Sequence, residues 1–139
     1  RIICSNVEMA DVFAKLYYHM WSSLDEEDRC KEFEITGGTE DLKRAYRQVA
    51  VAPEHLPYSV TMVSYCGKPR FVVVLSLVFG LSSAVMSFNR IARFLTGMLR
   101  RALAVCVDNY FDDFLQIEMK NGACQAKDLV YFVTRLMGW

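Results

Sequence analysis

Two adjacent aspartates, Asp112 and Asp113, are the residues of this chain best suited to chemistry. They directly follow Tyr110 and Phe111 and stand between two apolar segments. Two carboxylates that converge repel each other and need a cation, and oxygen ligands of this kind suit Mg²⁺, which also takes water and substrate phosphate as ligands. The alternative is a solvated polar turn that binds no metal. A third acid elsewhere in the chain would favour the metal site.

The residues on either side of this pair predict a hairpin that carries it. Residues 103–107 form a short apolar run, and residues 114–119 alternate between apolar and polar with a period of two. That alternation is typical of a half-buried strand. We therefore expect a strand, a turn and a second strand, with Asp112 and Asp113 at the tip and their side chains pointing in different directions.

A third acid opens the upstream segment Asp41-Leu42-Lys43-Arg44-Ala45-Tyr46-Arg47-Gln48. A second segment reads Phe79-Gly80-Leu81-Ser82-Ser83-Ala84 and leads to Phe88. Together with Tyr110-Phe111-Asp112-Asp113, these segments resemble three motifs of the reverse transcriptase palm domain, in the family's order and at its spacing. The resemblance is to the retrotransposon type and covers roughly residues 35–139.

This resemblance implies an RNA-directed DNA polymerase that transfers nucleotides from deoxynucleoside triphosphates to a primer 3′-hydroxyl. The residues that match the family's catalytic metal ligands are Asp41, Asp112 and Asp113. They would hold two Mg²⁺ ions, or Mn²⁺, which stabilise the attacking and leaving oxygens. The implied partners are an RNA or DNA template with its primer and the deoxynucleoside triphosphates.

The resemblance also implies a nucleotide pocket, formed by Ala45, Tyr46, Phe79 and Gly80. The ring of Tyr46 matches the position that excludes a 2′-hydroxyl, which favours deoxynucleotides. The alternative for Tyr46 is an aromatic residue of the core. Gly80 ends the apolar run 71–78, and a glycine there lets the backbone approach a ligand closely.

A helix expected over residues 82–102 positions a row of arginines. Arg90, Arg93, Arg100 and Arg101 fall within an arc of about 100° on that helix, opposite an apolar face. We predict that this basic stripe binds nucleic acid through phosphate, with an ordinary solvated helix face as the alternative. Lys43, Arg44 and Arg47 form a smaller basic group beside Asp41. These two groups give local positive charge to a chain whose net charge is zero.

The remaining elements complete an α+β fold, a polymerase palm-like antiparallel sheet backed by helices with part of the fingers. Helices are expected from a Ser5 cap through about Trp21 and over residues 124–137, and strands near residues 58–66 and 70–78. Gly37 and Gly38 predict a turn that carries Asp41. The apolar stripe of the first helix, which includes Val12, Phe13, Leu16 and Met20, is expected to pack in the core.

Length predicts one domain over residues 1–139. The resemblance implies that this domain is reverse-transcriptase-like, with residues 1–34 as a helical lead-in and 35–139 as palm with partial fingers. Because no thumb, ribonuclease H segment or amino-terminal finger strands are apparent, we expect a fragment. Five widely spaced cysteines predict reduced thiols and an intracellular protein, in nucleus or cytoplasm. Residues 71–88 carry no charge, but their β-branched residues, serines and Gly80 favour a strand and a helix over a membrane span.

Three hypotheses for the function follow. The first is an active polymerase palm that uses Mg²⁺. The second is a polymerase-derived remnant without activity that serves as an interaction module. The third is another palm-type enzyme, such as a nucleotide cyclase, which would not depend on a primer.

Overall fold

A computed structural model describes residues 6–29 and 33–139. The chain divides into two compact units, which are treated separately. One unit contains residues 1–42 and 91–139, and the other contains residues 43–90. Both are built from helices and antiparallel strands, so the α+β class is confirmed. The prediction of one domain over residues 1–139 remains a prediction.

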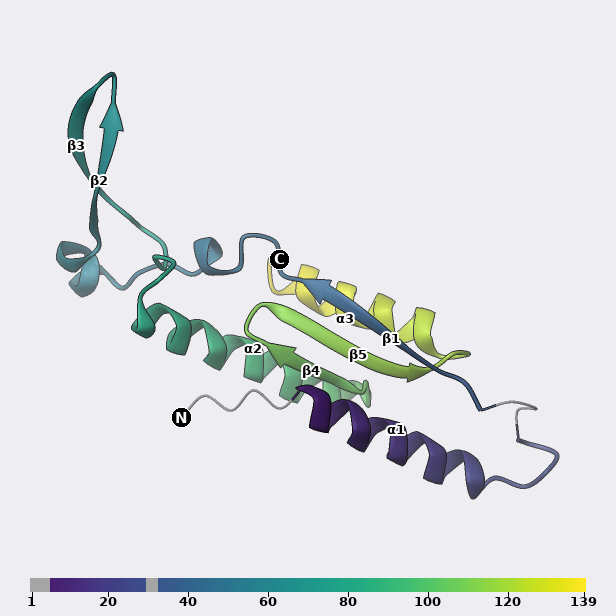
Figure 1. Ribbon diagram of the computed structural model, residues 1–139. Helices are drawn as coiled ribbons and strands as arrows, with labels where there is room; N and C mark the ends of the chain where they lie inside the picture. The colour runs from purple at the N-terminus through teal and green to yellow at the C-terminus, as the bar shows by residue number, and fades with distance from the viewer. Residues whose placement is uncertain (1–5, 30–32) are drawn as a thin grey trace. The chain divides into compact units, whose positions relative to one another are not determined.

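The first unit is built on a three-stranded antiparallel sheet in the order β1-β5-β4 (Figure 1). Strand β1 covers Ile35–Asp41, β4 covers Val107–Tyr110 and β5 covers Asp113–Met119. Helix α1 covers Asn6–Ser22 and helix α3 covers Ala123–Leu136, and both contact β5. The last helix and the hairpin are confirmed, but the first strand of the hairpin covers residues 107–110 instead of the expected 103–107. The Ser5 cap lies outside the described residues.

The turn predicted to carry Asp41 is wrong, because residues 35–41 form a strand. Glycines have a low intrinsic preference for strands, so the local sequence does not explain this. Every residue of β1 is paired with one of β5, from Ile35 opposite Met119 to Asp41 opposite Asp113. Pairing along the whole length of β5 therefore overrides the preference of Gly37 and Gly38 for a turn.

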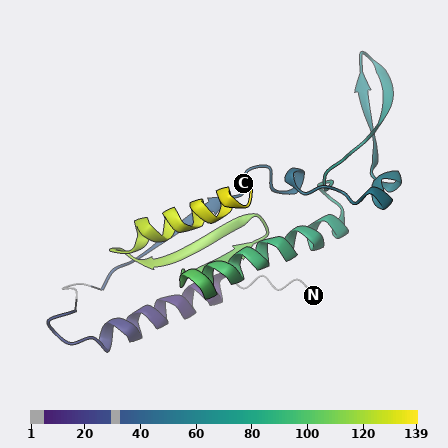
Figure 2. The same cartoon turned by 180° about the vertical axis from the view of Figure 1, so that it is seen from behind.

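The helices lie on one face of this sheet, on which β5 places its even-numbered residues. Phe114, Gln116 and Glu118 are buried, while the odd-numbered residues of β5 are half-buried or exposed. Tyr17 of α1 donates a hydrogen bond to Glu118, which places α1 on the buried face. In Figure 2 α3 lies in front of β1, and in Figure 1 the same helix lies behind that strand. The opposite face of the sheet is the more open one.

The apolar stripe of α1 is only partly in the core. Phe13 is buried and Tyr17 is half-buried, but Val12, Leu16 and Met20 remain about half exposed. The prediction that the whole stripe packs in the core is therefore wrong. The stripe spans more of the helix surface than its contacts with β4 and β5 cover.

Helix α2 covers Ser82–Leu103, as predicted, and the division between the two units falls within it. The part of α2 in the first unit buries Ala92, Leu95 and Leu99 completely. The expected apolar face is thus confirmed. No helix in the described part of the chain is long and apolar enough to cross a membrane.

The second unit contains two short 3₁₀ helices, η1 (Ala45–Gln48) and η2 (Pro53–Tyr58), and a hairpin of β2 (Val60–Tyr65) and β3 (Lys68–Val73). Cys66 and Gly67 link the strands with φ of 51° and 72°, as a type I′ turn requires. The strands predicted near residues 58–66 and 70–78 are shifted and shorter. The chain leaves β3 after Val73 and makes only an isolated bridge between Ser76 and Ala50.

Candidate active site

Asp41 and Asp113 lie directly opposite each other at one end of the sheet. Asp113 also pairs with Tyr110 on its other side, so the three residues form one row across β1, β5 and β4. Directly opposed residues point to the same face, with Cβ atoms about 5 Å apart. Both aspartates are exposed. The fold therefore brings together two acids that are 72 positions apart in the chain.

This row belongs to the open face of the sheet. Successive residues of a strand alternate between the two faces, and Asp113 precedes the buried Phe114. The carboxylates of Asp41 and Asp113 thus point away from the face that carries the helices. A substrate can approach them from solvent without moving α1 or α3.

Asp112 lies beside this row in the two-residue loop between β4 and β5. Its backbone carbonyl accepts a hydrogen bond from the N–H of Leu42 at 3.1 Å, which ties the loop to the end of β1. The other loop residue, Phe111, has φ of 55°, an unusual value for a bulky side chain. Backbone strain of this kind is typical of functional sites and costs about 1–3 kcal/mol.

The carboxylates of Asp41, Asp112 and Asp113 are oxygen ligands of the kind that a hard cation binds. The structure does not gather all three into one group. Among the described residues, no cluster of three or more His, Cys, Asp and Glu side chains is placed to hold a metal. Mg²⁺ is commonly held by only one or two carboxylates, with water and substrate phosphates as its other ligands. The paired Asp41 and Asp113 supply that minimum, and Asp112 is the next acid along the loop.

The residues predicted to bind the nucleotide lie in the second unit. Ala45 and Tyr46 are buried in η1, and only 7% of Tyr46 is exposed. The Tyr46 ring packs against Phe88 at 4.7 Å and Phe79 at 5.4 Å between ring centroids. This burial is what the alternative, a core aromatic, predicts. Phe79, by contrast, is 81% exposed, and Gly80 follows it with φ of 97° in a turn.

The smaller basic group surrounds an open cavity of about 500 Å³. Lys43, Arg44, Arg47 and Gln48 line it, all within six residues of the chain. Arg44 has φ of 59°, and this left-handed conformation precedes η1. Three cationic side chains around one space provide a place for phosphate oxygens.

The predicted arginine stripe on α2 is divided by its contacts. Arg90, Arg93 and Arg101 are exposed, whereas the side chain of Arg100 is only 32% exposed. Arg100 donates to the Val107 carbonyl at 2.6 Å and forms an ion pair with Asp108 at 2.8 Å. It therefore holds α2 to β4, and only the other three arginines face solvent.

Sequence reasoning missed a buried polar cluster beneath the sheet. Glu118, which is 9% exposed, accepts hydrogen bonds from the Tyr17 hydroxyl and, at 2.9 Å, from the backbone N–H of Cys106. Burial, followed by the contacts with Cys106 and Glu118, raises the pKa of Tyr17 well above its ordinary value of 10.0. Burial likewise raises the pKa of the Cys106 thiol. The only signal in the sequence was the pair of polar residues Gln116 and Glu118 at every second position after Phe114.

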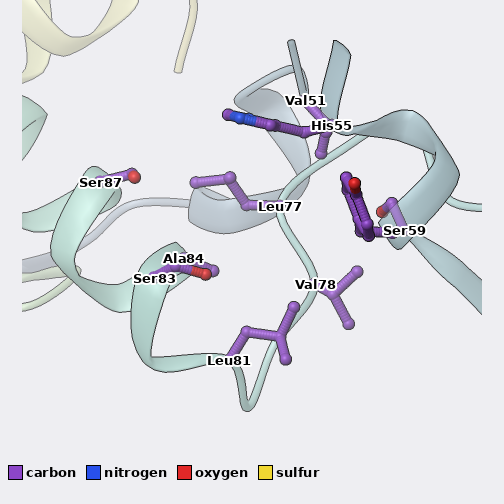
Figure 3. A pocket seen from close by; sticks show the side chains of 10 residues that line it. Val51, His55, Ser59, Leu77, Val78, Leu81, Ser83, Ala84 and Ser87 are labelled. Atoms are coloured by element: carbon purple, nitrogen blue, oxygen red, sulfur yellow. The ribbon is translucent and has the colours of Figure 1, made fainter. Parts of the chain in front are cut away.

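A second cavity that the sequence did not reveal lies in the second unit and measures about 350 Å³. Figure 3 shows Leu77, Val78 and Leu81 around this space, with the His55 ring near its edge. The walls are mostly apolar, and the first turns of α2 add Ser83 and Ser87. Its size suits a small ligand, and its lining contains no aspartate, glutamate, lysine or arginine.

The described cysteines Cys66, Cys106 and Cys124 are free thiols, as predicted, and the other two lie outside the described residues. Comparison of the chain with protein-family models and with curated proteins finds no match.

Proposed function

We propose that this chain is the palm of an RNA-directed DNA polymerase, with Asp41, Asp112 and Asp113 as its metal ligands. The observation that carries this proposal is the pairing of Asp41 with Asp113 on the open face of the sheet. Neither the spacing in the sequence nor local preferences require that pairing. A chance match of short motifs has no reason to bring the first acid to the third motif.

Within this proposal, the chain's own residues position the reactants. Asp41 and Asp113 hold divalent ions, which supply charge stabilisation to the attacking and leaving oxygens when they are bound. In the second unit, the basic group of Lys43, Arg44 and Arg47 is a separate candidate for binding phosphate oxygens. Because phosphoryl transfer needs little covalent chemistry from the protein, positioned carboxylates and cations are sufficient machinery.

Primer extension tests this function. The assay supplies template RNA, a DNA primer, deoxynucleoside triphosphates and Mg²⁺ to the full chain. Asp113→Asn is expected to lower the rate at least about a hundredfold, the scale of losing one preorganised stabilising group. Asp128→Asn, which neutralises an exposed acid on α3, is the matched control and should leave the rate unchanged.

Extension that survives Asp113→Asn would show that the acids are not the site. Product formed equally well without a primer would instead support a nucleotide cyclase.

An inactive interaction module is the second candidate, and the exposed apolar residues of the β2–β3 hairpin favour it. Val60, Met62, Phe71 and Val73 share one face of this hairpin, and each is about half exposed or more. This candidate predicts no extension by the wild-type chain under any divalent ion, together with unchanged folding in Asp113→Asn. A two-stranded hairpin alone is marginally stable in water, so its apolar face would be covered by a partner.

A further inference from the structure

A polar cavity of about 230 Å³ lies in the first unit, between β1, β5 and the first turn of α3. It is separate from the row of Asp41 and Asp113, because its lining residues from β5 are Gln116 and Glu118, which belong to the helix-covered face. The volume is below the roughly 300–1,000 Å³ of pockets for drug-sized ligands. A ligand of this cavity must therefore be small.

Gln116 is the feature that points to a ligand. Its side chain is 6% exposed and lines the cavity, yet it forms no hydrogen bond with another described residue. Strand β5 turns this polar side chain inward and leaves the apolar Leu115 and Ile117 half-buried on the open face. The amide of Gln116 is thus available to hydrogen-bond with water or with a polar ligand in the cavity.

Positive charge lies at one side of the cavity. Helix α3 begins at Ala123, and its N-cap residue, Gly122, provides no side-chain hydrogen bond to the first turn. The free N–H groups of such a turn and the helix dipole attract an anionic group. Lys127 also lines the cavity and forms no ion pair with another described residue. Together these groups suit a carboxylate.

Negative charge lies elsewhere in the same cavity, on Glu118. This carboxylate already accepts from Tyr17 and from the Cys106 N–H, but each of its oxygens has a second lone pair. Lys127 does not pair with Glu118, so the opposite charges stand apart. Gly38 lies opposite Gln116, and nothing stands within 4 Å of the position that a Cβ would take there. The glycine therefore leaves this side of the cavity open to a ligand.

We propose that this cavity binds a small zwitterion of amino-acid size. Its carboxylate lies at the first turn of α3 beside Lys127, its ammonium faces Glu118, and the Gln116 amide hydrogen-bonds between them. A simple anion is disfavoured by Glu118, and a simple cation is disfavoured by Lys127 and the helix terminus. This site does not depend on the proposed polymerase function.

The experiment is an NMR titration of the full chain, with the Gln116 side-chain amide as the reporter. L-Alanine is the probe, and acetate and methylammonium each carry only one of its charges. L-Alanine is expected to shift the Gln116 signals saturably, with a Kd of about 1 mM, the scale of a weak small-ligand complex. Acetate and methylammonium should each bind at least about tenfold more weakly, a difference of about 1.4 kcal/mol.

Two variants separate binding from folding. Lys127→Ala changes an exposed residue, so it should fold normally and weaken L-alanine binding several-fold. Gly38→Val places a β-branched side chain in the open space of a strand, so it should keep the fold and abolish binding. Lys120→Ala, which removes a lysine paired with Glu34 outside the cavity, is the control and should bind like the wild type.

The proposal is overturned if Gln116 does not respond to L-alanine well above about 10 mM. It is also overturned if acetate binds as tightly as L-alanine, or if a folded Gly38→Val still binds it.

Discussion

Neutralising one member of the Asp41–Asp113 pair should change stability in opposite directions with and without a divalent ion. The two carboxylates lie on one face, with Cβ atoms about 5 Å apart. At that separation in water, the repulsion between two unit charges is about 0.8 kcal/mol, and salt screens part of it. Without divalent ions, Asp113→Asn should therefore raise the free energy of unfolding by somewhat less than 1 kcal/mol.

Mg²⁺ should reverse that order. An ion present at about ten times its Kd stabilises the folded state by about 1.4 kcal/mol. Only the wild type has both carboxylates to bind Mg²⁺, so only the wild type should gain the full stabilisation. Urea unfolding in EDTA and in Mg²⁺ measures the free energy of unfolding without and with the divalent ion. The control Asp128→Asn shows the general effect of removing a negative charge. If Mg²⁺ stabilises Asp113→Asn as much as the wild type, the pair is not a metal site.

Two further predictions concern the contacts beneath the sheet. Tyr17→Phe should cost about 2 kcal/mol of unfolding free energy, because Glu118 loses a hydrogen bond to a charged group, whereas Tyr18→Phe should change little. Because the folded-state pKa of Tyr17 is raised, the contribution of Tyr17 to the free energy of unfolding is fully present below about pH 10 and is lost as the pH rises further. In urea titrations, the difference in unfolding free energy between wild type and Tyr17→Phe should therefore narrow above about pH 10. In the same assay, Arg100→Ala should lower the free energy of unfolding by about 2 kcal/mol, because Arg100 is bonded to β4. Arg101→Ala should lower it by less than about 0.5 kcal/mol. Equal effects of the two substitutions would contradict the structural role of Arg100.

The helices and the hairpin could be predicted because their signals are local. The apolar spacing of residues 82–102 gave α2, and the alternation of residues 114–119 gave β5. Strand β1 could not be predicted, because Gly37 and Gly38 favour a turn and only the distant β5 holds them extended. Local preference is a weak guide wherever pairing between distant segments decides the conformation.

The orientation of β5 also lay beyond the sequence. Leu115, Ile117 and Met119 are its apolar set, yet Gln116 and Glu118 face the helices and are buried. A shift of one residue exchanges the two faces of a strand, so its alternation alone does not fix which face is covered. Here Glu118 finds partners in Tyr17 and Cys106, which are far from it along the chain.

The predicted site residues divide in a similar way. The aspartates were identified from residue type and motif order, and the structure adds the pairing of Asp41 with Asp113. Arg100 belonged to the predicted basic stripe by helix geometry alone. Its pairing with Asp108 could not be foreseen, because helical spacing says nothing about which side chains of a neighbouring strand come within reach.

Paramagnetic broadening by Mn²⁺ tests the central claim most directly. Mn²⁺ is titrated into the isotope-labelled chain at low concentration, and the backbone amide signals of Asp41, Asp112 and Asp113 are compared with that of Gly67 in the β2–β3 turn. If the acids form the metal site, their signals broaden first, and Asp113→Asn prevents this. Broadening that is equal at Gly67, or unchanged in Asp113→Asn, would contradict a metal site at these aspartates.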